Sequence, residues 1–155
     1  MRRIFKWILS FLVANTVVWA VGQAITRSRT SRDLFGDQLE FYTFWNGTEF
    51  VPRSLSLRHV KARVLMGGAT VDLREALPSP NGLTVDIGTL MGGTAVLVSK
   101  DWDVEVEETT RSSSVEVRLD SGTEASSDLP KVTVHLATTF GGALVGYELP
   151  SQQDT

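Results

Sequence analysis

The hydrophobic pattern of the chain changes once, near Leu34. Residues 7–26 are twenty consecutive uncharged positions with a basic residue on each side. An α-helix of that length is about 30 Å long, the thickness of the hydrocarbon core of a bilayer, so we predict one transmembrane helix. From Leu34 onward apolar and polar residues alternate over short stretches, as in residues 101–107. That period of two predicts β-strands, and an Asn-Gly pair at 46–47 predicts a hairpin turn.

Three segments of this body share a Gly-Gly pair followed by alternating residues. They are residues 65–73, 90–98 and 139–147, which align without gaps at offsets of 25 and 49 residues. Residues 114–119 fall where an intervening copy without Gly-Gly belongs. One such repeat cannot bury its own apolar face, so we predict an all-β domain of stacked strands, a β-solenoid. The side chains expected to point into its core are Ala69, Val71, Leu73, Thr94, Val96, Val98, Ala143, Val145 and Tyr147.

The glycine pairs are predicted to be structural corners. A residue with a Cβ resists the conformations that a sharp bend or a close backbone approach needs. A glycine loop that binds phosphate would instead require a following helix, which the alternating pattern does not predict. The predicted corners are Gly67, Gly68, Gly92, Gly93, Gly141 and Gly142.

The predicted organisation has three parts. Residues 1–33 form a membrane anchor and a polar linker, residues 34–150 form the β repeat domain, and residues 151–155 form a tail. A signal peptide cleaved near residue 24 is an alternative, because small residues there resemble a cleavage site. The numbers of basic residues before and after residues 7–26 are nearly equal. The slight excess before the helix favours an amino terminus inside the cell, which places the β domain outside the cytoplasm. We therefore expect a single-pass protein of the cell membrane.

Charge is divided unequally between these parts. The whole chain carries a net charge of −3, but nine basic and seventeen acidic residues from Leu34 onward give the body a net charge of −8. Such a body repels phosphate, which argues against nucleic-acid binding. The chain has no cysteine and two histidines, so thiol chemistry is excluded and few catalytic side chains remain. We therefore expect a protein that is not an enzyme and that holds no cofactor or metal.

Three groups of polar residues are candidate sites. The four acids of residues 101–107 would face one side of a strand, as a calcium site or as a solvated face that prevents edge pairing. Asp72 and Asp86 would serve as the acid and base of a glycan hydrolase, or point outward between apolar neighbours. His59 and His135 lie on separate strands and are expected at the surface rather than on a shared metal. The solvated interpretation is preferred for each group.

An apolar patch is the predicted interaction site. In the aligned repeats Ala95, Leu97 and Leu144 occupy positions that alternation turns outward, so neighbouring repeats would present apolar groups to a partner, unless a loop covers them. The body also has one basic cluster, either a contact for lipid headgroups or a solvated edge, formed by Arg53, Arg58, Lys61 and Arg63.

The Gly-Gly repeats resemble a known family. Residues 65–76, 83–87, 90–93 and 101–106 are similar to the LiaF-like carboxy-terminal domain of bacterial cell-wall-active antibiotic response proteins, and the resemblance covers residues 55–148. It implies a stacked, toastrack-type β domain fixed to the membrane and connected with envelope-stress signalling. Family members that carry several membrane spans act as accessory or inhibitory partners of a sensor histidine kinase, and the resemblance implies no catalytic residue.

Three hypotheses of function follow. The first is a membrane-anchored interaction module, accessory or regulatory in a cell-envelope stress response, with lipid bound through residues 7–26 and a membrane protein such as a sensor kinase as partner. The second is a passive structural or lipid-associated envelope protein. The third is an envelope glycan hydrolase that uses Asp72 and Asp86. The sequence sets neither the partner nor the oligomeric state.

Overall fold

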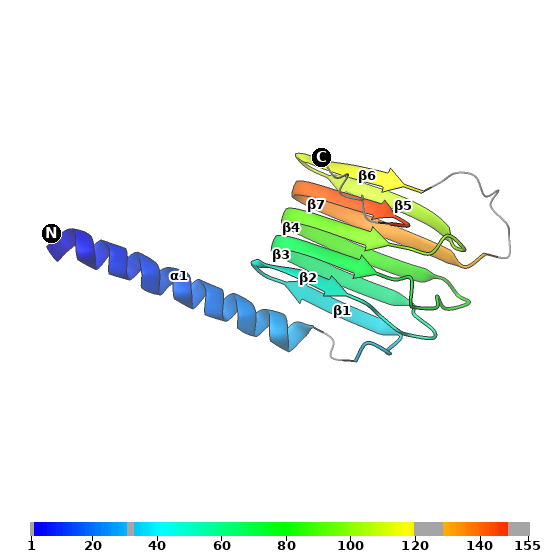
Figure 1. The fold of residues 1–155 in the computed structure, drawn as a ribbon, viewed down its shortest axis with the longest axis horizontal. Helices are drawn as coiled ribbons and strands as arrows, with labels where there is room; N and C mark the ends of the chain where they lie inside the picture. The colour runs from blue at the N-terminus through cyan, green and yellow to red at the C-terminus, as the bar shows by residue number, and fades with distance from the viewer. Residues whose placement is uncertain (1, 31–32, 120–128, 149–155) are drawn as a thin grey trace, which may run out of the picture.

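A computed structural model describes residues 2–30, 33–119 and 129–148, with helix side chains from residue 12 onward except at 25, 27 and 29. The predicted tail at 151–155 lies outside the described residues. One helix precedes seven strands (Figure 1). The elements are α1 Arg2–Arg29, β1 Gln38–Thr43, β2 Asn46–Phe50, β3 His59–Asp72, β4 Leu83–Leu97, β5 Asp103–Thr110, β6 Ser113–Arg118 and β7 Lys131–Gly146.

The strands form one parallel sheet. Its order is β1-β3-β4-β7-β5, with β2 added to β3 and β6 added to β7. β3, β4 and β7 run the full width of the sheet, whereas β1 with β2 and β5 with β6 each divide that width between two shorter strands. The sheet therefore has five levels, called rungs below. The prediction of a mainly β fold is confirmed.

Each full-length strand bends at its glycine pair, so the sheet folds over on itself. The first glycine of each pair has a positive φ, 113° at Gly67, 127° at Gly92 and 137° at Gly141. Only glycine adopts that conformation readily. A Cβ on Gly92 would also overlap the carbonyl oxygen of Gly67 on the next rung. The prediction of a corner is therefore correct for these three residues.

The core lies between the two halves of the folded sheet. Val60, Val85 and Val134 point into it from the first half, and Val96 and Val145 from the second. The inward positions predicted after each Gly-Gly are all buried, except for Tyr147, which packs half-buried against the core. Alternation fixed these positions because only one face of each half meets the core.

The order of the rungs differs from their order in the sequence. β7 pairs directly with β4, residue for residue through both glycine pairs, and β5 and β6 lie beyond β7. The prediction that residues 114–119 form a copy between the second and third repeats is therefore wrong, because these residues lie beyond the third repeat in the sheet. The acidic strand β5 instead occupies an edge of the sheet, where charge discourages pairing with other chains.

The Asn-Gly hairpin is also a wrong prediction. Asn46 and Gly47 begin β2 and lie in register with Gly67 and Gly68, and both β1 and β2 run parallel to β3. The preceding residue, Trp45, takes the positive φ of 56° at which the first rung turns. The Asn-Gly pair is thus the first rung's counterpart of the glycine pairs.

Helix α1 extends away from the sheet, and among the described elements it packs mainly against β1 of the first rung (Figure 1). The amide of Tyr42 donates a hydrogen bond to Oγ1 of Thr30, 3.1 Å away, which ties the end of the helical segment to β1. The helix predicted at residues 7–26 is confirmed as a helix. Within the described part of the chain, no helix combines the length and the apolar character needed to cross a membrane. The structure does not describe the side chains of residues 7–11, and the transmembrane assignment stays a prediction.

Candidate functional site

A groove of about 740 Å³ crosses the second half of the sheet. Its centre is formed by Thr70, Ala95 and Leu144, which are neighbours in the register of β3, β4 and β7. Glu49 continues the same row on β2, and Glu116 continues it on β6. Adjacent strands lie about 4.8 Å apart, so the Cα atoms of Glu49 and Glu116 lie about 19 Å apart at the two ends of a mainly apolar floor. The carboxylate of Glu116 is paired with Nε of Arg118 at 2.6 Å.

The second glycine of each pair lines this groove. Gly68, Gly93 and Gly142 form a row beside the central one, and none of them has a positive φ. A Cβ on Gly93 would meet its nearest atom, the carbonyl oxygen of Gly142, at 3.9 Å, an ordinary contact. The fold therefore does not require glycine at these three positions, and their assignment as structural corners stays a prediction.

The predicted interaction patch is only partly at the surface. Ala95 and Leu144 are half-buried neighbours in the groove. Leu97 is 2% exposed, so its assignment to the patch is wrong. In the register Leu97 lies between Asp72 and Gly146, which are both buried as well. Alternation fails here because both faces of the sheet are closed to water at the end of these strands.

Asp72 is a buried carboxylate rather than an outward one. Its side chain is 10% exposed, and Nε of Arg74 donates a hydrogen bond to Oδ1 at 2.8 Å. The backbone amide of Arg74 donates to the same oxygen at 3.1 Å. These bonds lower the pKa of Asp72 below the ordinary aspartate value of 3.8, although burial opposes the shift. Asp72 is thus an ionised carboxylate with a structural role, paired with the guanidinium of Arg74.

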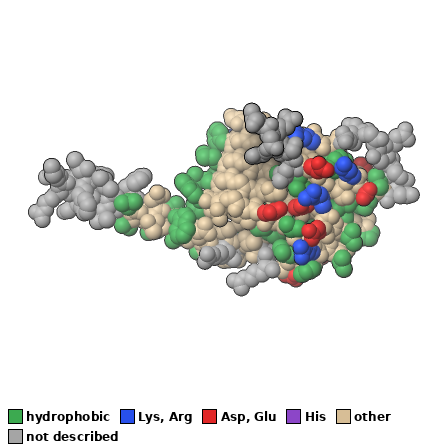
Figure 2. Space-filling view, viewed as in Figure 1, with side chains coloured by type: hydrophobic (Ala, Val, Ile, Leu, Met, Phe, Trp, Pro, Cys, Tyr) green, Lys and Arg blue, Asp and Glu red, His purple; other side chains and the backbone are tan. Residues whose placement is uncertain are grey.

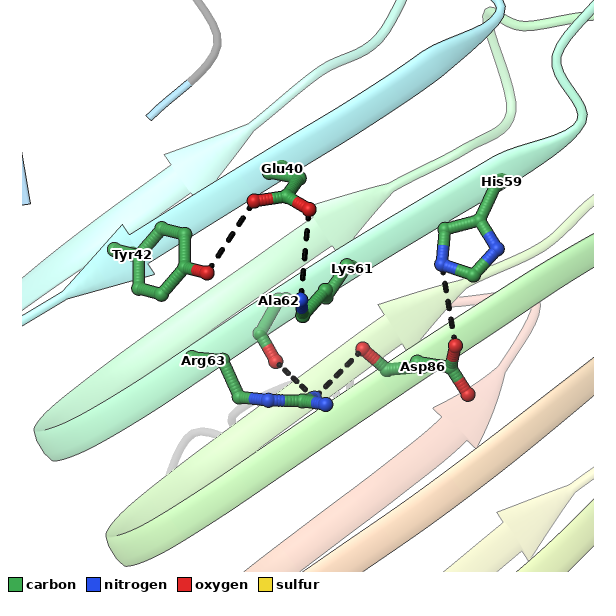
Figure 3. Close-up of polar contacts among 7 residues, drawn as sticks. All are labelled: Glu40, Tyr42, His59, Lys61, Ala62, Arg63 and Asp86. Carbon is green, nitrogen blue, oxygen red and sulfur yellow. Dashed lines mark hydrogen bonds and ion pairs between the residues drawn. The ribbon is translucent and has the colours of Figure 1, made fainter. Parts of the chain in front are cut away.

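Asp86 lies on the other half of the folded sheet, in register with Lys61 rather than with Asp72. Its Oδ2 is 3.2 Å from Nε2 of His59 (Figure 3). The structure therefore does not bring Asp72 and Asp86 together as the acid and base of a hydrolase.

A ladder of charges crosses the outer face of the first half. One residue from each rung contributes to it, in the register order Glu40, Lys61, Asp86, His135 and Glu107. Nζ of Lys61 lies 3.5 Å from Glu40, and Nδ1 of His135 lies 3.0 Å from Glu107. Cross-strand pairs of opposite charge stabilise neighbouring strands. Each of the two histidines contacts a carboxylate of this face, and the two do not share a site.

The predicted basic cluster is divided among separate partners. Nε of Arg53 lies 2.8 Å from Glu75, whereas Nη1 of Arg63 donates to the carbonyl oxygens of Ala62 and Asp86 at 3.2 and 3.3 Å (Figure 3). These cations do not converge on one anion site. Among the residues with described side chains, no three His, Asp or Glu gather as a metal site would require, and this includes the acids of β5.

Sequence reasoning missed the two ends of the groove. The sequence places Glu116 in an intervening repeat without Gly-Gly and Glu49 in a hairpin, which gives no reason to compare either with Leu144. Aligning the Asn-Gly pair with the Gly-Gly pairs would have placed Glu49 beside Thr70.

No family model, curated protein or solved structure matches the chain. The resemblance to the LiaF-like family stays a prediction.

Proposed function

We propose that this chain is a membrane-anchored, non-enzymatic interaction module, and that its folded sheet is a short β-solenoid whose groove binds an extended segment of a partner protein. The groove floor is the observation that supports this proposal. Three full-length rungs keep glycine at Gly68, Gly93 and Gly142 although a Cβ would fit at each. Small residues that the fold does not require leave room for the backbone of a bound segment to approach closely.

The groove also indicates what kind of segment fits. Its centre is apolar at Ala95 and Leu144, and it has a carboxylate at each end. The body around it carries a net charge of −8. An extended chain rises about 3.3 Å per residue, so a segment with an apolar centre and basic residues about six positions apart matches the groove.

Membrane anchoring is the second part of the proposal. It is supported by the uncharged residues 7–26 and by the exposure of the large apolar side chains of α1, each more than half exposed. They are Leu12, Val13, Val17, Val18, Trp19 and Val21. The resemblance to LiaF-like domains supports an accessory or regulatory role in a cell-envelope stress response, with a membrane protein such as a sensor kinase as partner.

The test is site-specific cross-linking in the native cell. A photo-reactive residue at Ala95 or at Leu144 should trap the same partner protein, and the same residue at Thr133, on the other half of β7, should not. Gly93→Leu should then abolish the cross-linked product formed from position 144, because the larger side chain fills the groove. A product that is equally strong from Thr133, or none from either groove position, would overturn the groove as the binding site and favour the passive envelope protein.

A further inference from the structure

The bend of the sheet exposes a row of large apolar side chains. We call it the bend ridge, and it comprises Trp45, Leu65, Leu90, Met91 and Phe140. Trp45 is the residue at which the first rung turns, and the other four lie one or two positions before the turning residue of their rung. The exposed fractions of the five side chains run from 45% to 59%. Met91 and Phe140 are neighbours in the register of β4 and β7. The ridge therefore runs across four of the five rungs instead of being scattered over the surface.

These side chains cannot join the core. The core begins on one side of the bend at the row of Val64 and Thr89, and on the other side at Ala69 and Thr94, all of which are buried. The residues between these two rows lie on the outside of the fold, where the chain turns back. No charged residue occurs at 65–66, 90–91 or 139–140. The ridge is thus an uncharged apolar edge that the fold leaves open.

Helix α1 is continuous with this ridge. Gly22 of the helix lies against the ring of Phe44, and Val17, Val18 and Val21 line one hollow together with Phe44 and Leu65. A second hollow is lined by Leu12 and Trp19 of the helix together with Trp45. The helix leaves the body on the side where the strands bend, and apolar side chains gather on the edge of the body beside it (Figures 1 and 2).

We propose that the bend ridge rests on the lipid surface into which α1 inserts. The inference relies on the membrane anchoring proposed above and adds how the domain lies on the bilayer. Tryptophan, phenylalanine, leucine and methionine side chains suit the boundary between headgroups and acyl chains. Arg111, which directly follows β5 at the bend and is exposed, adds a cation for headgroup phosphates. A lipid surface is favoured over a protein because one uncharged surface continues from the ridge onto the helix.

This arrangement also positions the groove. Gly68 and Gly93 follow directly after the residues at the bend, so the groove lies immediately behind the ridge. With the ridge on lipid, the groove stands at the membrane surface. Its occupant is then a segment close to the membrane, such as the stretch that follows a transmembrane helix in a membrane protein.

The chain has no cysteine, so single cysteines can be labelled without background. The full chain is reconstituted into vesicles of phosphatidylcholine and phosphatidylglycerol with an environment-sensitive fluorophore at Met91→Cys. Leu55→Cys, at an 80% exposed position between β2 and β3, is the matched control, and Thr16→Cys reports on α1. We expect a several-fold rise in emission at Met91 that a lipid-borne quencher removes, and no rise at Leu55.

The outcomes separate this inference from the anchoring. Emission typical of water at Met91→Cys, together with emission typical of lipid at Thr16→Cys, overturns the ridge contact alone. Emission typical of water at both positions overturns the anchoring too. A label at Met91 that is shielded without vesicles, and more so at higher protein concentration, assigns the ridge to a second copy and overturns the lipid contact. Leu90→Glu should abolish the lipid signal read at Phe140→Cys while leaving the melting temperature within a few degrees.

Discussion

The hydroxyl oxygens of Thr89 and Thr94 lie 2.6 Å apart, one on each side of the bend in β4. Both residues are buried, 2% and 4% exposed, and their hydrogen bond joins the two halves of the folded sheet across the core. The neighbouring rungs lack this bond. β3 has Val64 and Ala69 in the corresponding positions. The central rung therefore contains a polar clamp that β3 lacks, beside Thr138 of β7, which is also buried.

The losses from removing the two members of this clamp should not add. Thr94→Val leaves the buried hydroxyl of Thr89 without its partner, and we expect a loss of about 1–3 kcal/mol in the free energy of unfolding. The double variant Thr89→Val/Thr94→Val should lose less than the sum of the two single variants, because no unpaired hydroxyl remains. Urea denaturation of the four proteins measures this coupling. Strict additivity would show that the bond contributes nothing.

The two glycines of one pair should respond oppositely to alanine. Gly92→Ala should lower the free energy of unfolding by about 3 kcal/mol or more, because φ is 127° and the added Cβ would overlap the carbonyl oxygen of Gly67. Gly93→Ala should remain within about 1 kcal/mol of the wild type, because its Cβ has room. Thermal and urea unfolding provide the comparison. Equal losses would mean that the second glycine also serves the fold.

Asp72 predicts an acid-sensitive step in stability. Its pKa in the folded protein lies below the value of 3.8 expected when unfolded, so its contribution is fully present above about pH 4 and is lost as the pH falls through the lowered pKa. Asp72→Asn should therefore be less stable than the wild type at pH 7, and the difference should shrink below pH 4. Glu116→Gln, in an exposed pair with Arg118, should not show this convergence.

Two leucines on neighbouring strands should separate folding from binding. Leu97→Asp puts a carboxylate at a position that is 2% exposed, and we expect the domain to unfold. Leu144→Asp puts the same group in the open groove, so the melting temperature should change by no more than a few degrees while the cross-linked partner is lost. Circular dichroism decides the first point. A folded Leu97→Asp protein would contradict the buried row.

Hydrophobic alternation predicted the inward rows because one face of each strand meets the core. It could not place Leu97, where both faces are closed, nor Asn46, whose register with Gly67 is a property of the neighbouring strand. The spatial order of the rungs was also outside its reach, since parallel strands need not pair in sequence order. Leu65 and Leu90 stood before their glycine pairs in the sequence. Only the direction of the bend revealed that these side chains face outward.

The interior position of β7 has a consequence for how the protein is made. A ribosome releases residues 38–118 first, and at that stage β4 lacks its neighbour and the β5–β6 rung has no strand to pair with in the described sheet. The strand that joins them follows all the other described strands in the sequence. The nascent domain therefore has an open parallel edge at β4 until residues 131–146 emerge. A chaperone that shields β4 during this interval should raise the yield more than one that acts after release.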